Sequence, residues 1–162
     1  TWNEAWSPRL SLHYDFASGD SGKAGEYHRF DTLFGPRRGE FGPTGIFGLL
    51  SRNNINSIGL RLSSKPNPRM DASLFWRANF TDEAGDAFAR TGLVNSTSNS
   101  RFAGHQLEAR LRYWLWPKRL RFDGGVTWFQ RGRFFREADN GNGEGDPLYF
   151  YSSLEWFFGG VK

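Results

Sequence analysis

The stretch QLEARLRYWLWPKRLRFDGGVTWFQR, residues 106–131, decides the fold. Each half alternates apolar and polar residues with a period of two, which is typical of β-strands with two unlike faces. Between the halves lies the short break WPKR, which contains a proline. The stretch therefore predicts an antiparallel hairpin in which Tyr113 faces Phe122 and Arg112 faces Asp123.

The same alternation recurs along the rest of the 162-residue chain, and no segment has a convincing 3.6-residue period. Around the break KPNPR we expect Leu60 to face Leu74 and Ile58 to face Trp76. The predicted fold is all-β, an antiparallel up-and-down arrangement of about six strands. We place these strands at about residues 9–17, 55–64, 69–80, 104–116, 119–131 and 147–158.

The connections between these strands alternate in length. Three are short and contain Pro, Lys or Arg, and three are long and rich in Gly, Asn, Asp and Ser; the long ones are residues 17–54, 81–103 and 132–146. An up-and-down sheet then has its tight turns on one rim and its long loops on the other, as in outer-membrane β-barrels. The short turns carry five bases and no acid: Arg9, Lys65, Arg69, Lys118 and Arg119.

Composition narrows the possible partners. The formal charge of +4 is too small for a nucleic-acid-binding tail, so no nucleic-acid partner is predicted. No run of 18 apolar residues could form a transmembrane helix, and cysteine is absent. The chain lacks an initiating Met and a signal-peptide pattern, so we expect a mature form or a fragment.

The alternation leaves open which face of the sheet meets water. In a soluble lipocalin-like barrel that binds an apolar ligand, the apolar face points inward; in a membrane barrel it points to lipid. Three features favour a transmembrane barrel: an arginine-rich polar face, the alternating loop lengths, and aromatic residues at strand ends. Those aromatic residues are Phe16, Phe80, Trp128, Trp156 and Phe158. Six strands are fewer than the 8 of the smallest membrane barrels, so we expect part of a larger barrel or assembly with partners.

Several motifs resemble the alginate export family of bacterial outer-membrane β-barrels. They are RLSLHYDFASGD, HRFDTLFGPRRGEFGPTGIFGLLSRNNI, the turn KPNP and AGHQLEARLRYWL. The resemblance implies that the chain is the C-terminal section of one barrel domain of about 18 strands. It also implies a non-enzymatic, porin-like channel that exports an alginate-like polyuronate through an arginine-lined lumen. The expected partners are then this anionic polysaccharide, outer-membrane lipid and periplasmic export components.

Polar-face arginines are the main candidates for the substrate path, because arginine binds carboxylates and stays charged. The alternative is that these arginines only form structural cross-strand pairs with acids, such as Arg112 with Asp123. The candidate lumen residues are Arg61, Arg77, Arg110, Arg112, Arg121, Arg131, Asp15, Asp71, Glu108 and Asp123.

The segment FDTLFGPRRGEFGPTG, residues 30–45, breaks the alternation inside the longest loop. Its rings could pack as a plug, and its glycines and prolines fix turns. We expect it to narrow the mouth of the conduit; the alternative is that it only folds over the barrel wall. The candidate constriction residues are Phe30, Asp31, Phe34, Arg37 and Arg38.

Catalytic and metal chemistry have weaker signals. His13 lies beside Asp15 on the polar face without a third ligand, so a solvated histidine is expected there. The loop DNGNGEGD, residues 139–146, has calcium-type oxygen ligands but lacks EF-hand spacing, so calcium is a weak expectation and no other cofactor is predicted. No catalytic residue is predicted, although the many carboxylates leave an outer-membrane hydrolase as a further alternative.

Overall fold

The computed structural model describes residues 6–33, 41–42, 47–141 and 145–159. Its strands form one antiparallel sheet in sequence order, so every strand pairs with its chain neighbours. The strands are β1 (Arg9–Ala17), β2 (Ile55–Asn67), β3 (Met70–Phe80), β4 (Phe102–Trp116), β5 (Leu120–Arg131) and β6 (Leu148–Trp156). In the part of the chain that is described, β1 and β6 are the edges of this open sheet and do not pair with each other. The all-β, up-and-down prediction is confirmed.

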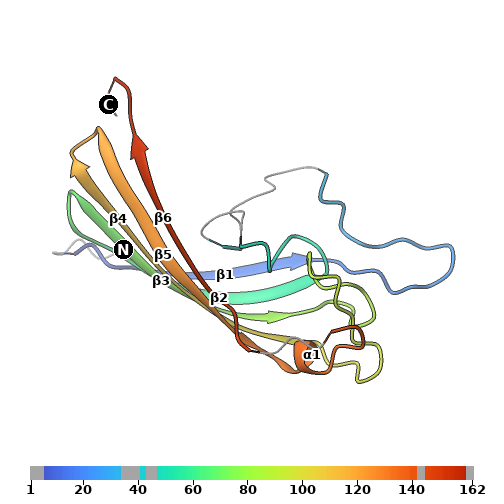
Figure 1. Cartoon of the computed structure of the whole chain (residues 1–162). Coiled ribbons are helices and arrows are strands. Elements are labelled where there is room, and N and C mark those ends of the chain that lie inside the picture. The colour runs from blue at the N-terminus through green and yellow to red at the C-terminus, as the bar shows by residue number, and fades with distance from the viewer. Residues whose placement is uncertain (1–5, 34–40, 43–46, 142–144, 160–162) are drawn as a thin grey trace.

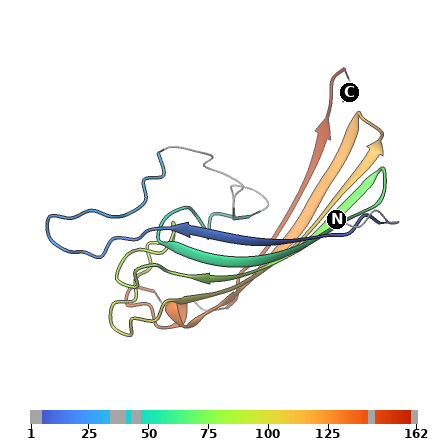
Figure 2. The same cartoon turned by 180° about the vertical axis from the view of Figure 1, so that it is seen from behind.

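The sheet is strongly bent and has two different ends (Figures 1 and 2). At one end the tight turns join β2 to β3 and β4 to β5, and at the other end the three long connections gather. The third long connection contains a single helical turn, α1 (Arg133–Arg136), which the sequence did not predict. Among the described residues, no helix is long and apolar enough to cross a membrane.

The register of the β4–β5 hairpin matches the prediction. Tyr113 lies opposite Phe122, and Arg112 lies opposite Asp123. This agreement follows from the tight turn between Trp116 and Leu120, which leaves little freedom for the strands to slide.

The predicted register of the β2–β3 hairpin is wrong by two residues. Leu74 lies opposite Leu62, not Leu60, and Leu60 lies opposite Trp76. The reason is that β2 continues through Lys65 and Pro66 to Asn67, so the turn is shorter than expected and an irregularity follows Ser64. Because the side-chain period is two, a slip of two residues keeps every side chain on its predicted face.

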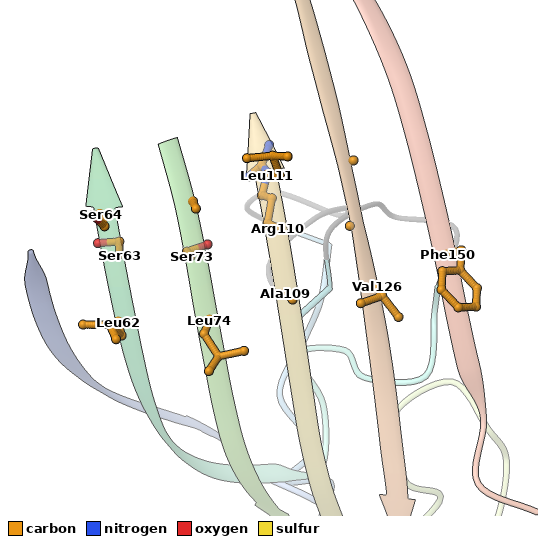
Figure 3. A pocket seen from close by; sticks show the side chains of 13 residues that line it. Leu62, Ser63, Ser64, Ser73, Leu74, Ala109, Arg110, Leu111, Val126 and Phe150 are labelled. Carbon is orange, nitrogen blue, oxygen red and sulfur yellow. The ribbon is translucent and has the colours of Figure 1, made fainter. Parts of the chain in front are cut away.

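The apolar face of the sheet is the exposed one. Its large side chains reach the surface from every strand, with exposed fractions such as 74% for Leu12 and 69% for Phe150. Small residues of β3, β4 and β5 leave a hollow of about 590 Å³ among them. Figure 3 shows Leu62, Leu74, Val126 and Phe150 along this hollow, contributed by four different strands.

The buried core lies instead where the long loops meet the strand ends. Phe88 packs against Phe134 and Phe135 of α1, with ring centroids 5.6 and 5.4 Å apart, and Phe135 contacts Phe129 of β5 at 5.6 Å. These contacts explain why α1 forms: a single helical turn places both of its phenylalanines in this buried cluster. The loops are therefore fixed by a core of their own rather than by the middle of the sheet.

This arrangement predicts that Phe134→Ala loosens the long loops without dissolving the sheet. A buried Phe→Ala change lowers the free energy of unfolding by about 3 to 5 kcal/mol, and here the lost contacts are those of the loop core. Hydrogen exchange of the whole protein in detergent should rise in residues 81–101 and 132–141. Phe150→Ala, on the exposed apolar face, is the matched control and should leave this exchange unchanged. Equal effects of both variants would contradict a separate loop core.

Candidate functional site

The polar face of the sheet carries a set of arginine–carboxylate pairs. Four of the six arginines predicted for the lumen bind a carboxylate on another strand. The pairs are Arg77 with Asp15 (2.6 Å), Arg112 with Asp71 (2.8 Å), Arg121 with Glu155 (2.5 Å) and Arg110 with Asp123 (Nε to Oδ1, 2.9 Å). The structure thus brings the predicted arginines together with acids, three of which were themselves predicted lumen residues.

The partner expected for Arg112 is different in the structure. Although Arg112 lies opposite Asp123 in the register, its Nε donates to Asp71 on β3, and Asp123 takes Arg110 instead. The Asp123 carboxylate also accepts the hydroxyl of Tyr151 at 3.2 Å. The predicted Arg112–Asp123 ion pair is therefore wrong, because Arg112 pairs with Asp71, which lies directly opposite it on β3, and Asp123 binds its diagonal neighbour Arg110.

One glycine on the polar face lets one of these side chains reach across a strand. Gly59 of β2 lies between His13 and Arg77, and its missing side chain lets Arg77 reach Asp15 on β1. A Cβ at Gly59 would lie 2.7 Å from a ring carbon of Phe75 and 3.0 Å from Cγ of Arg77. The Arg77–Asp15 pair therefore depends on a residue without a side chain.

Phe75 is a functional neighbour that sequence reasoning did not single out. It is 2% exposed and lies between two guanidinium groups, with Arg61 at 4.2 Å and Arg77 at 4.1 Å from the ring centroid. Arg77 also lies 5.1 Å from the ring of Phe41 in the long loop. An aromatic residue at a polar-face position, directly opposite Arg61 in the register, was the available signal.

A cavity of about 540 Å³ opens beside these groups, between β1–β3 and the first long loop. Three arginines and one acid line it, together with His13 and two loop phenylalanines: Arg52, Arg61, Arg77, Asp15, Phe30 and Phe41. Within the described residues, Nε of Arg61, Nε of Arg77 and Nε2 of His13 are buried and have no hydrogen-bond partner. Buried donors without partners beside excess positive charge suit a carboxylate ligand.

The long-loop candidates divide into three outcomes. Phe30 lines the cavity, and its role as a constriction residue stays a prediction. Asp31 instead accepts the backbone N–H of Leu33 at 2.8 Å, which fixes a local turn. Phe34, Arg37 and Arg38 lie outside the described residues. Arg52 and Phe41, from the same loop, line the cavity and were not predicted, because the loop sequence has no periodicity that places single residues.

Two predicted lumen residues do not pair in the same way. Arg131 anchors the third long loop: its guanidinium donates to the carbonyl of Gly145, and its backbone N–H donates to Asp146 at 2.9 Å. Glu108 is buried on the polar face and interacts electrostatically with Arg61, Arg77 and Arg110. It thus offsets part of the positive charge around the cavity.

Residues 142–144 of the expected calcium loop lie outside the described residues, and the carboxylates of Asp139 and Asp146 form other hydrogen bonds. Asp139 accepts the Ser96 hydroxyl at 2.6 Å and the Ser96 N–H at 2.7 Å. Hydrogen bonds from the Ser96 and Thr97 side chains lower the pKa of Asp139 to about 2. This carboxylate is therefore ionised and joins the second and third long loops. Among the residues described, no three His, Asp or Glu side chains come together as a metal site.

Comparison with known proteins gives one match. A family model described as Alginate export matches residues 1–145. No curated protein and no solved structure matches the chain.

The strand-crossing pair yields a prediction for Gly59→Ala. The added Cβ should displace Phe75 and Arg77 and separate Arg77 from Asp15, at a cost of about 1 to 3 kcal/mol in unfolding free energy. Urea unfolding in lipid vesicles measures it, and Asp15→Asn should then add little in the Gly59→Ala background. Gly85→Ala is the matched control, because the nearest atom to its Cβ would be 3.9 Å away. Full additivity of the two changes would show that Gly59 does not support the pair.

Proposed function

The chain belongs to the alginate export family, whose members are outer-membrane proteins for polysaccharide export, and on this premise we propose its part in that transport. The sheet forms a section of the wall of a larger transmembrane β-barrel. Its apolar face meets lipid, and its polar face lines the conduit for an alginate-like polyuronate. The chain contributes no catalytic group to this process.

Exposure of the apolar face supports the assignment of the two faces. Monomeric proteins in water seldom expose an apolar patch larger than a few hundred Å², whereas here the exposed apolar side chains extend across all six strands. A lipocalin-like barrel would bury this face around its ligand. The open edges of β1 and β6 support a larger barrel, because unpaired strand edges are too costly in lipid.

The observation that carries the transport proposal is the cavity where Arg52, Arg61 and Arg77 converge. A uronate carries one carboxylate per sugar, and these guanidinium groups meet it where the first long loop narrows the path. Asp15 and Glu108 offset part of their charge. Binding is therefore weak enough for the polymer to leave again, as conduction requires.

The paired arginines farther along the polar face extend this path. Arg112 donates only its Nε to a described acid, and a guanidinium has five N–H donors in all. A passing carboxylate can therefore use the remaining donors without breaking the pair with Asp71. A series of such weak binding sites lets a polyanion move from one arginine to the next instead of binding tightly at one position.

This mechanism predicts that Arg61→Gln lowers polyuronate transport selectively. Arg61 forms no direct ion pair among the described residues, so its loss removes a substrate contact, and the nearby buried Glu108 keeps its interactions with Arg77 and Arg110. With the whole barrel in liposomes, efflux of an oligomannuronate should fall about 10-fold, as expected for the loss of one charged hydrogen bond of about 1.4 kcal/mol. Efflux of a neutral oligosaccharide of equal length should stay within about twofold.

Arg133→Gln provides the matched control for this experiment. It removes the same charge from α1, where Arg133 is exposed and pairs with Glu137 at 2.7 Å. This variant should transport both sugars like the unaltered protein. Equal loss of charged and neutral efflux in Arg61→Gln would show that Arg61 only maintains the wall, and the proposed path would then be wrong.

A further inference from the structure

A second cavity lies at the opposite end of the polar face, beside the tight β2–β3 turn. Its volume is about 520 Å³, within the range of ordinary small-molecule sites. It is lined by the turn itself and by polar-face residues of β3, β4 and β5. None of its lining residues belongs to the cavity under the long loop.

The charges around this short-turn cavity are unbalanced. Four cations line it against one acid: Lys65, Arg69, Arg112 and Arg121 against Asp71. Arg112 already binds Asp71, and Arg121 binds Glu155. The side chains of Lys65 and Arg69 have no ion pair among the described residues, so they supply the positive charge that remains.

The opposite end of the sheet carries acids as well as bases. There the carboxylates of Asp82 and Asp86 accept backbone N–H groups of Gly19 and Asp20, each at 2.9 Å. The short turns carry only bases, so the short-turn rim attracts an anion. In outer-membrane barrels the short turns are periplasmic, which is the side from which an exported polymer enters.

The indoles of Trp6 and Trp114 give the same cavity an apolar wall, and Phe157 packs beside Trp114. The rings of Trp114 and Phe157 lie 5.3 Å apart, and the Arg121 guanidinium lies 5.4 and 5.3 Å from their centroids. Together with Glu155, these rings hold Arg121 in one orientation. The indole of Trp6, 64% exposed, lines the cavity as well. A pyranose ring has C–H-rich faces that pack on such indoles, while its carboxylate binds the cations.

We propose that this short-turn cavity is an entry site that binds one or two uronate residues of the polymer before it reaches the lumen. The inference rests on the proposed function and names a second contact of the same substrate. Cations without acidic partners attract the carboxylate, and the indoles contribute contact area for the sugar ring. A neutral sugar would contact the indoles but would not bind the cations, so the site selects acidic pyranoses.

The test uses the complete barrel in nanodiscs of zwitterionic lipid and a fluorescently labelled hexamannuronate. In Lys65→Gln/Arg69→Gln, affinity measured by fluorescence anisotropy should fall about 5- to 20-fold at low salt. The difference in affinity between the variant and the unaltered protein should shrink in about 0.5 M salt, because both side chains are exposed and their charges are screened. A labelled neutral mannohexaose should bind none of the proteins measurably.

Lys118→Gln/Arg119→Gln is the matched control. It removes the same two charges from the neighbouring tight turn on the same rim, outside the cavity lining. Its affinity should stay within about twofold of the unaltered protein. Equal losses in the two double variants, or no loss in either, would overturn the entry site. Loss of binding to the unaltered protein in discs with phosphatidylglycerol would assign the cavity to a lipid head group and overturn it too.

Liposome efflux separates this inference from the function on which it rests. If efflux depends on Arg61 but Lys65→Gln/Arg69→Gln leaves hexamannuronate affinity unchanged, the entry-site proposal is overturned and the transport proposal is retained. Binding that depends on Lys65 and Arg69 in a barrel that shows no polyuronate efflux would overturn the transport proposal and retain the binding site.

Discussion

Charge pairing between strands is the interaction on which the polar face depends. A two-residue period places every charged side chain of the sheet on one face, so like charges on neighbouring strands would repel unless acids alternate with bases. The pairs of Arg77 with Asp15 and Arg112 with Asp71 meet this requirement. The opposite face has no charges to balance, and lipid can therefore solvate it. Both the proposed membrane contact and the proposed polymer path rest on this separation.

The sequence predicts the sheet well, because strand periodicity and short turns act locally. The β4–β5 register is right for this reason, and the β2–β3 register fails by two residues because proline at position 66 does not stop β2 from continuing. The helix α1 was not predictable from periodicity, since one turn is too short to have any. It forms because Phe134 and Phe135 bury themselves against rings from distant segments.

The sequence predicts on which face of the sheet the charged residues lie, but it does not predict their partners. The alternation places the arginines and their acids on the polar face, but it does not say which neighbouring strand supplies the partner: Arg112 binds Asp71 on β3 and not Asp123 on β5, although it lies opposite both. Arg52 and Phe41 were missed because a loop without periodicity gives no rule for the direction of a side chain. Their contribution to the cavity appears only once the loop is folded over β1 and β2.

Gly59 has a mechanical consequence for the wall. An ordinary ladder of pairs joins each strand only to its neighbour, and a sheet joined in this way bends easily between adjacent strands. The Arg77–Asp15 pair passes over Gly59 and ties β3 directly to β1, so bending at β2 would stretch it. Phe75 and the second guanidinium fill the space above the same strand. This part of the sheet is thereby stiffened against flattening beside the cavity under the first long loop, and in the proposed barrel it would help to hold the width of the passage.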